Sequence, residues 1–345
     1  MGQQQTKTVL VTGGCGFIGS NLIRFLVSCR PGWTIVNVDL LTYAGNEANL
    51  ADIGQKPRYV FVQQDIAEFS KMRGVFESYN PWAVINCAAQ THVDRSLENG
   101  IDFVKTNILG TQVLLELARV YESRFVQVSS DEVYGSLGPT GKFDEEMPLK
   151  PNSPYAASKA AADLLSLAAF HSCGQQVVIT RCSNNYGPFQ HPEKLISLMI
   201  TNALDHKALP VYGRGDNIRD WIHVGDHCKG LLAALEKGKS GRVYNFGGAS
   251  ERTNDMVVRM VLSILGRPES LIRYVSDRPG HDLRYAMDFR RAQQELGWKP
   301  EIPFEDGLRD TVQWYIGNED WWRPIKRGVY REYYEKQYGA RLRGV

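Results

Sequence analysis

A short apolar run that ends in closely spaced glycines constrains the fold of this chain more than any other feature. Residues 8–11 (Thr-Val-Leu-Val) are mostly β-branched and predict a buried parallel strand. Gly13, Gly16 and Gly19 follow, and a helix is predicted over residues 21–29. Glycines at such a turn let the backbone approach a pyrophosphate, whose negative charge the helix N-terminus favours. A purely structural turn is the alternative.

The alternation of strand and helix continues beyond this first unit. Further strands are predicted at residues 34–39, 59–63, 83–86, 125–128 and 177–181, with helices at 102–121 and 155–172. This order predicts an α/β fold of the Rossmann type, in which helices cover both faces of a doubly wound parallel sheet.

An acidic residue at the end of the second predicted strand indicates which ligand the glycine-rich turn binds. Asp39 lies twenty residues after Gly19, where a carboxylate can bind the adenine-side ribose hydroxyls and would repel a 2′-phosphate. The sequence therefore predicts NAD rather than NADP. Asp65 ends the third strand, either as an acceptor for the adenine amino group or as a cap of the next helix.

The pattern becomes less regular near residue 184. We therefore predict an NAD-binding domain over residues 1–183 and a smaller, mixed α/β lobe, mainly substrate-binding, over residues 184–345. The chain is expected to return to the first sheet within residues 220–250, as a helix over 220–235 and a strand over 243–246.

Composition excludes several classes of partner. The net charge of +2 gives no reason to expect nucleic acid or an anionic membrane surface. No apolar run approaches the roughly 18 residues of a membrane span. The six cysteines include no CxxC pair, so we expect a reduced, cytoplasmic protein without a metal site.

Two groups of titratable residues suggest catalysis. Tyr155 and Lys159 are one helical turn apart, so the ammonium can stabilise a phenolate that removes a proton from a sugar hydroxyl while a nicotinamide takes the hydride. The alternative is that the Tyr-Lys spacing arises by chance and has no catalytic role.

Asp131 and Glu132 end another predicted strand, and in isolation such a pair is usually a solvated turn. Since hydride transfer needs only one base, two further carboxyl groups indicate a second step, namely proton removal with loss of water.

The quoted motifs resemble those of the extended short-chain dehydrogenase/reductase family and, within it, the dTDP-glucose 4,6-dehydratases. The matching stretches are TGGCGFIGSN, LTYAGN, THVDRS, SSDEVYG, SPYAASK, SNNYGP, PEKLI, RDWIHVGDH and DRPGHDLRYAMD. The resemblance covers essentially the whole chain, and DEVYG together with SNNYGP and DRPGHD is its most specific part.

The resemblance implies a role for each catalytic residue. Tyr155, with Lys159, removes the proton of the glucose 4-hydroxyl while NAD takes the C4 hydride. Glu132 then removes the C5 proton, Asp131 protonates the departing 6-hydroxyl, and Ser130 hydrogen-bonds the 4-hydroxyl. Return of the hydride to C6 gives the 4-keto-6-deoxy sugar.

The resemblance also implies the binding residues. Expected cofactor contacts are Gly13, Gly16, Phe17, Ile18, Gly19, Asp39, Leu40, Leu41, Thr42, Asp65, Ile66, Ala88, Ala89, Gln90, Thr106, Tyr155, Lys159 and Asn185. Expected contacts of the nucleotide-sugar substrate are Thr91, Ser130, Asn184, Lys194, Leu195, Pro210, Tyr212, Arg219, Asn254, Arg278 and His281.

Three departures from the family pattern leave alternatives open. Ser130 replaces a usual Thr, Gln90-Thr91 replaces Glu-Ser, and Leu40-Leu41 stands where Lys-Leu is usual. They leave the reaction class intact, and the alternative they leave open is a 4,6-dehydratase acting on UDP-glucose or an N-acetylated nucleotide sugar. Independent of these departures, a 4-epimerase or a decarboxylase of the same fold and a non-catalytic dinucleotide sensor are further alternatives.

The helix that contains Tyr155 is apolar on nearly all its faces. Small apolar residues recur from Ala156 to Ala169, and such a helix is buried on more than one side. The second lobe could provide the additional cover, but we expect a homodimer in which this helix meets its symmetry mate.

Overall fold

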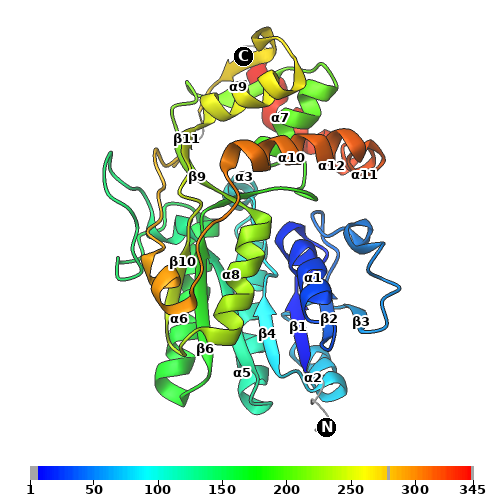
Figure 1. The fold of residues 1–345 in the computed structure, drawn as a ribbon, viewed down its shortest axis with the longest axis vertical. Coiled ribbons are helices and arrows are strands. Elements are labelled where there is room, and N and C mark those ends of the chain that lie inside the picture. The colour runs from blue at the N-terminus through cyan, green and yellow to red at the C-terminus, as the bar shows by residue number, and fades with distance from the viewer. Residues whose placement is uncertain (1–6, 278–279, 343–345) are drawn as a thin grey trace.

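The computed structural model describes residues 7–277 and 280–342. Its first lobe is built on a seven-stranded parallel sheet with the order β10-β6-β5-β4-β1-β2-β3 (Figure 1). The strands are β1 (Thr8–Thr12), β2 (Thr34–Asp39), β3 (Tyr59–Gln63), β4 (Ala83–Asn86), β5 (Arg124–Ser130), β6 (Val177–Cys182) and β10 (Val243–Phe246). The predicted doubly wound α/β fold is confirmed.

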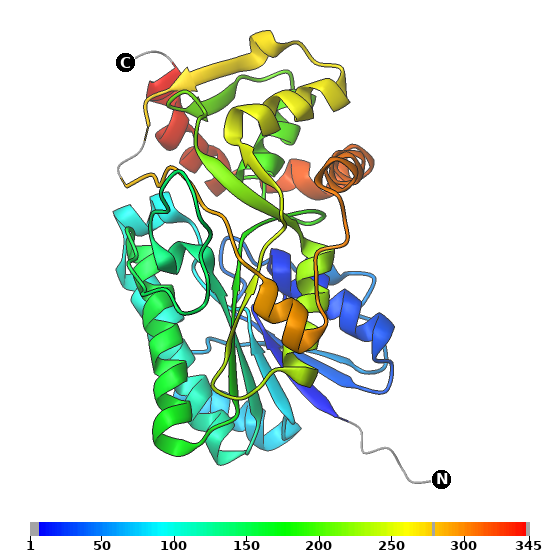
Figure 2. The ribbon, with the colours of Figure 1, turned by 60° about the vertical axis from the view of Figure 1, so that its left-hand side comes forward.

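Helices cover both faces of this sheet because its strands are apolar on both sides. Val9 and Val11 pack with α1 (Phe17–Cys29) and α8 (Val224–Lys237). On the other face, Leu10 packs with α2 (Phe69–Tyr79) and α5 (Thr111–Val120), and α6 (Pro154–Cys173) lies beside α5 (Figure 2). Each fully buried Leu, Ile or Val contributes roughly 1.5–3 kcal/mol, so this double cover stabilises the sheet.

The helix predicted over residues 102–121 is interrupted in its first half. A short α4 (Ile101–Phe103) continues as a π-helical turn, Val104–Gly110, before α5 begins. Asn107 in this turn accepts a hydrogen bond from Gln90 N (2.9 Å) and donates to Gln90 O (3.0 Å) and Ser158 Oγ (2.8 Å). The turn therefore fastens the loop after β4 to α6, a use typical of π-helical turns near functional sites.

The second lobe lies above the carboxyl ends of the strands (Figure 1). It holds a three-stranded sheet and a two-stranded sheet, with the orders β11-β9-β7 and β12-β8. Its strands are β7 (Asn184–Tyr186), β8 (Leu209–Tyr212), β9 (Ile218–His223), β11 (Glu251–Thr253) and β12 (Ile272–Val275). Its helices are α7 (Leu195–Leu204), α9 (Asn254–Leu265), α10 (Phe304–Gly317), α11 (Glu319–Ile325), α12 (Val329–Tyr334) and α13 (Ala340–Leu342).

The remaining short elements connect these units. They are α3 (Val93–Glu98), the 3₁₀ turns Glu47–Leu50, Asp131–Tyr134 and Glu269–Leu271, and the π-helical turns Ala292–Leu296 and Glu335–Gly339. Within the described ranges, no helix combines the length and apolar content needed to cross a bilayer.

Two predicted helix starts are wrong. The helix predicted over residues 21–29 begins earlier, at Phe17. The helix expected over residues 220–235 begins only at Val224, because residues 220–223 belong to β9. There β9 pairs with β7 on one side and β11 on the other. His223 ends the strand and accepts a hydrogen bond from Gly225 N (3.1 Å), which caps α8. Strand β10 joins the first sheet beside β6, whereas the domain division at residue 183 stays a prediction.

Candidate active site

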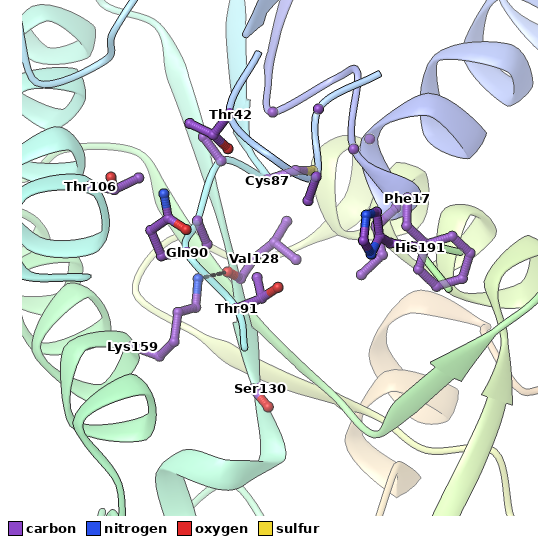
Figure 3. A pocket seen from close by; sticks show the side chains of 18 of the residues that line it. Phe17, Thr42, Cys87, Gln90, Thr91, Thr106, Val128, Ser130, Lys159 and His191 are labelled. Carbon is purple, nitrogen blue, oxygen red and sulfur yellow. Dashed lines mark hydrogen bonds between the residues drawn. The ribbon is translucent and has the colours of Figure 1, made fainter. Parts of the chain in front are cut away.

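A cavity lies at the carboxyl ends of the central strands, and it gathers most of the predicted site (Figure 3). Every predicted cofactor residue except Leu41 lines it. The predicted catalytic residues Ser130, Asp131, Glu132, Tyr155 and Lys159 line the same cavity, as do the predicted substrate residues Thr91, Asn184 and Lys194. A single cavity therefore joins the glycine-rich turn to the acidic pair.

The glycine-rich turn leaves room for an anion at the start of α1. Gly13 has φ +67°, and a Cβ there would lie 2.7 Å from Ala88 Cα, so only glycine fits without strain. Gly16 is the N-cap of α1 and supplies no side-chain cap. The N–H groups of the first turn are thus not satisfied by a capping side chain, which suits a pyrophosphate.

The Asp39 carboxylate is held in position by two backbone groups. It accepts hydrogen bonds from Cys15 N (2.9 Å) and Leu41 N (2.8 Å). Burial raises its pKa, and these two bonds oppose the rise. Leu41 adopts φ +59° to make its bond, so this residue orients Asp39 instead of lining the cavity. The remaining lone pairs of Asp39 suit ribose hydroxyls, so these residues fit NAD.

The position of Asp65 is compatible with both predicted roles, a helix cap and an acceptor for the adenine amino group. Its Oδ1 accepts a hydrogen bond from Ala67 N (2.9 Å), as expected of a cap, and its Oδ2 pairs with Lys105 Nζ at 2.8 Å. It also lines the cavity, so an adenine contact stays a prediction.

The acidic pair lies on a 3₁₀ turn directly after β5. Ser130 begins the turn, because its Oγ accepts from Glu132 N (3.3 Å), and it donates to Asp131 Oδ1 (3.1 Å). Asp131 is 2% exposed, and its Oδ2 has no hydrogen-bond partner among the described residues. Burial raises the pKa of Asp131 well above its usual value, and the neighbouring Glu132 raises it further. Asp131 is thus suited to be a protonated acid.

Tyr155 and Lys159 enter the cavity from the first turns of α6. Ser153 caps this helix by accepting from Ala156 N (3.1 Å), and Pro154 occupies its first position. Lys159 Nζ donates to Val128 O at 2.6 Å (Figure 3). Burial raises the pKa of Tyr155 well above its usual value, with Glu132 adding to the rise, and burial lowers the pKa of Lys159. Tyr155 therefore needs a nearby positive charge to become a base.

Residues from the start of the second lobe close the cavity. Lys194 Nζ donates to Thr91 O (3.0 Å), and Asn184 Oδ1 has no hydrogen-bond partner among residues 7–277 and 280–342. Asn185 Oδ1 lies 2.9 Å from Nδ1 of His227, a completely buried residue, so the Asn185 amide is held in one orientation. A buried oxygen without a partner, as in Asn184, is suited to accept from a ligand.

Six predicted substrate residues lie outside the lining of this cavity, all in the second lobe. They are Leu195, Pro210, Tyr212, Arg219, Asn254 and His281. The Arg219 guanidinium donates to the carbonyl oxygens of Ile218 and Asp282 and lies 4.4 Å from the centre of the Tyr285 ring. Tyr212 and His281 are neighbours, with ring centres 6.0 Å apart. Arg278 lies outside the described residues, and the substrate contacts of all seven stay predictions.

The sequence interpretation missed the segment just before Lys194. Gln190, His191 and Glu193 line the cavity, and both Gln190 Oε1 and Glu193 Oε2 lack hydrogen-bond partners in the described part of the chain. The only signal was their place in the quoted motif PEKLI and immediately before it. Within the described residues, no group of His, Cys, Asp and Glu side chains could hold a metal ion.

Under the role that the resemblance implies for Asp131, its replacement with Asn is expected to slow water loss about 100-fold, because an amide cannot give a proton to a leaving hydroxyl. In the unmodified protein the acid form of Asp131 is lost as pH rises through its raised pKa, so elimination falls on the alkaline side. The Asn variant should lack this fall. The measurement is the pH dependence of water loss.

The same substitution has an opposite expected effect on stability. A carboxyl group whose pKa is higher in the folded state stabilises fully only below its unfolded pKa, near 3.9, and this contribution is lost as pH rises through the folded value. The Asn variant should therefore unfold at a higher temperature than the unmodified protein at neutral pH, with the difference vanishing in acid. A lower unfolding temperature at neutral pH would contradict the buried-acid interpretation.

Comparison with known proteins agrees with this geometry. The family described as GDP-mannose 4,6 dehydratase matches residues 10–311. A probable dTDP-glucose 4,6-dehydratase of Sinorhizobium fredii is 48% identical over 339 residues, which cover 93% of this chain and 96% of that protein. The dTDP-glucose 4,6-dehydratase 1 of Escherichia coli is 45% identical over 359 residues, covering 96% and 99%.

A solved structure is similar over the same extent. The dTDP-glucose 4,6-dehydratase of Streptomyces venezuelae, in a complex that contains NAD, has a TM-score of 0.90 and 47% identity, covering 92% of this chain and 100% of that one. The fold and the site together define an enzyme of the extended short-chain dehydrogenase/reductase class. Within that class, the chain belongs to the dTDP-glucose 4,6-dehydratase family, which confirms the resemblance drawn from its motifs.

Proposed function

We propose that this protein binds NAD and converts dTDP-glucose to the 4-keto-6-deoxy sugar with loss of one water. The observation that carries the proposal is the buried Asp131, whose Oδ2 has no hydrogen-bond partner among the described residues. Asp131 lies next to Glu132 and lines the same cavity as Tyr155 and the glycine-rich turn. A 4-epimerase needs neither an acid for C6 nor a base for C5, so the acidic pair favours the dehydratase.

The first half of the reaction is oxidation at C4. Gly13, Gly16 and Asp39 would hold NAD, which when bound would supply the acceptor for the C4 hydride and the source of the hydride for C6. Tyr155 removes the proton of the 4-hydroxyl, and the ammonium of Lys159 favours the phenolate that this requires. Ser130, whose Oγ borders both Asp131 and Glu132, holds the 4-hydroxyl in reach.

The second half is elimination of water across C5 and C6. The C4 ketone makes the C5 proton acidic, and Glu132 removes it as a carboxylate. Asp131, kept protonated by burial, gives its proton to the departing 6-hydroxyl. When the hydride returns to C6, Glu132 gives the proton back to C5, which completes the 4-keto-6-deoxy sugar. Two adjacent carboxyl groups can hold opposite protonation states because the charge of one raises the pKa of the other.

The direct test is incubation of the purified protein with dTDP-glucose and, separately, UDP-glucose. The readouts are the alkali-induced absorbance of a 4-keto-6-deoxy sugar and the mass lost as one water. Product from dTDP-glucose with little from UDP-glucose is the expected result. Absence of water loss from either sugar, in protein that binds NAD, would refute the proposed reaction.

Replacing Asp39 with Asn is expected to weaken NAD binding by roughly 10- to 100-fold, the range for loss of a hydrogen bond to a charged group. The preference for NAD over NADP should shrink at the same time, because the repulsion of the 2′-phosphate is removed. Titration with both cofactors measures the two effects. Asp52→Asn is the matched control, since Asp52 pairs with Arg24 on the surface. An unchanged ratio of affinities would contradict the role of Asp39.

We also propose that the protein forms a homodimer through α6. Leu164 on this helix is 58% exposed, and the segment packed beside it presents Ile101 and Val104, which are 74% and 51% exposed. Leu164→Glu is expected to convert the dimer to a monomer in light scattering at micromolar concentration, since a charge cannot be buried there unpaired. Ile316→Glu on α10 should leave the mass unchanged. A dimer that survives Leu164→Glu excludes this interface.

We infer a reducing, cytoplasmic setting from the cysteines. All six lie in the described ranges and are free thiols. Burial raises the pKa of the Cys87 and Cys182 thiols to about 12, so these two thiols at the cavity lining are unreactive. Thiols without disulfides are typical of cytosolic proteins.

A further inference from the structure

Four side chains from separate parts of the chain meet at the edge of the cavity and have no place in the mechanism above. These residues, the clasp, are Tyr43, Arg95, Glu193 and Tyr333. Tyr43 Oη donates to Glu193 Oε1 (3.0 Å), and the Arg95 guanidinium carbon lies 3.9 Å from the ring centre of Tyr43 and 4.0 Å from that of Tyr333. Arg95 Nε is also 3.5 Å from Glu193 Oε2.

On one side, the clasp holds the loop over residues 40–46, which is built into the cofactor site. Asn46 N donates to Cys15 O in the glycine-rich turn (2.9 Å). Gly45 lies against the ribose-binding carboxylate, because a Cβ there would be 2.8 Å from Asp39 Oδ1. Displacement of Tyr43 would therefore disturb the glycine-rich turn and the Asp39 carboxylate, which are both suited to hold NAD.

On the other side, the clasp holds the cavity wall at residues 190–194. Glu193 lines the cavity and is 6% exposed, and His191 meets the Tyr43 ring edge-on at 5.7 Å. Burial would raise the pKa of Glu193, but the charges of His92, His191, Lys194 and Arg95 outweigh it and lower the pKa to about 2. The clasp thus contains a fully ionised carboxylate in a buried site.

These contacts combine strong interactions. A hydrogen bond to a buried charge and a guanidinium between two aromatic rings are both worth more away from water. Tyr333 lies on α12, and Arg95 lies on α3, so the contacts reach from the C-terminal helices to the loop after β2. Opening the loop would break the contacts of Tyr43 with Glu193, Arg95 and His191 together, while Arg95 would stay against Tyr333 and Glu193.

We propose that the clasp retains NAD for the whole catalytic cycle by tying the loop over residues 40–46 to the second lobe. This inference rests on the proposed function, in which the hydride taken from C4 must return to C6 of the same sugar. If the cofactor left between these steps, the products would be reduced cofactor and an oxidised sugar, which carries its 6-hydroxyl before elimination and a C5–C6 double bond after it. A device that slows cofactor release is therefore useful to this chemistry.

The test is the rate at which bound NAD exchanges. The holoenzyme is loaded with radiolabelled NAD and chased with unlabelled NAD, and the retained label is followed after rapid desalting. Tyr43→Phe keeps the ring on Arg95 and removes only the hydroxyl, so it should exchange NAD roughly 10- to 100-fold faster, the range for one hydrogen bond to a buried charge. Glu193→Gln should act in the same direction.

Two controls separate retention of NAD from general packing. Tyr274→Phe breaks a comparable bond between a tyrosine and a carboxylate, that to Asp255 Oδ1 (2.7 Å), at a position outside the cavity lining, and should exchange NAD like the unmodified protein. The double variant Tyr43→Phe/Glu193→Gln should exchange NAD more slowly than the product of the two single effects predicts, because both changes weaken the same Tyr43–Glu193 hydrogen bond, whereas Glu193→Gln also weakens the ion pair with Arg95.

The outcomes distinguish the clasp from the proposed reaction. Exchange that is unchanged in Tyr43→Phe, or equally accelerated in Tyr274→Phe, would overturn the clasp while dehydration of dTDP-glucose continues. Protein that holds NAD but releases no water from any nucleotide sugar would overturn the reaction and leave the exchange result standing. With dTDP-glucose and no added NAD, turnover by Tyr43→Phe should decline with time and recover when NAD is supplied.

Discussion

Replacing Glu132 with Gln is expected to stop the reaction between its two halves. An amide of nearly the same shape cannot remove the C5 proton, so formation of the 4-keto-6-deoxy sugar should fall by about 10³- to 10⁴-fold. Oxidation at C4 should persist, because the charge of Glu132 raises the pKa of Tyr155 and its removal makes the phenolate easier to form. Reduced nicotinamide should therefore accumulate on the protein when dTDP-glucose is added.

The measurement is stopped-flow absorbance of reduced nicotinamide, with mass spectrometry of the released sugar. The expected signal is a burst of at most one reduced cofactor per chain without water loss. Glu146→Gln is the matched control, because Glu146 is 75% exposed and pairs with Arg291 outside the cavity lining. Normal water loss in Glu132→Gln would show that another group removes the C5 proton.

Replacing Tyr155 with Phe is expected to stop the reaction before its first step. The phenolic oxygen is the only part removed, and the ring can still pack edge-on against Phe103 at 6.3 Å. Loss of the base should lower both oxidation and product formation by about 10⁴-fold. No reduced nicotinamide should form, in contrast to Glu132→Gln.

The same stopped-flow experiment separates the two variants, and thermal unfolding with NAD titration confirms that Tyr155→Phe is folded and loaded. If Tyr155→Phe formed reduced nicotinamide at the unmodified rate, the base for C4 would lie elsewhere. If both variants showed the same burst, the division of the reaction between Tyr155 and Glu132 would be wrong.

Most of the central sheet follows from local patterns. Strands such as residues 34–39 and 83–86 are short, apolar and bounded by turns, and they occur at the predicted residues. The glycine-rich turn, Asp39 and the acidic pair were equally predictable, because each stands at the end of a strand or directly after it. In a parallel sheet the carboxyl ends of neighbouring strands lie at one edge, so residues that follow strands are brought together.

Features that depend on partners distant in the chain were not predicted. Residues 220–223 form a strand because β7 and β11 lie on either side, and nothing in their own composition distinguishes them from the first turn of a helix. Likewise, the π-helical turn around Asn107 is visible only through its contacts with Gln90 and Ser158. Such elements are set by tertiary pairing, which overrides weak local propensity.

The chemistry of the site divides in the same way. Residue types and their order along the chain were enough to predict that Tyr155 and Lys159 share one helix and that two carboxyl groups lie beside them. They were also enough to predict a dinucleotide site built from residues earlier in the chain. The protonation of Asp131 and the clasp of Tyr43, Arg95, Glu193 and Tyr333 were not accessible in this way. Burial sets the pKa of Asp131, and folding brings the four clasp residues together across nearly the whole chain. Both depend on distances in space, to which separation along the chain is no guide.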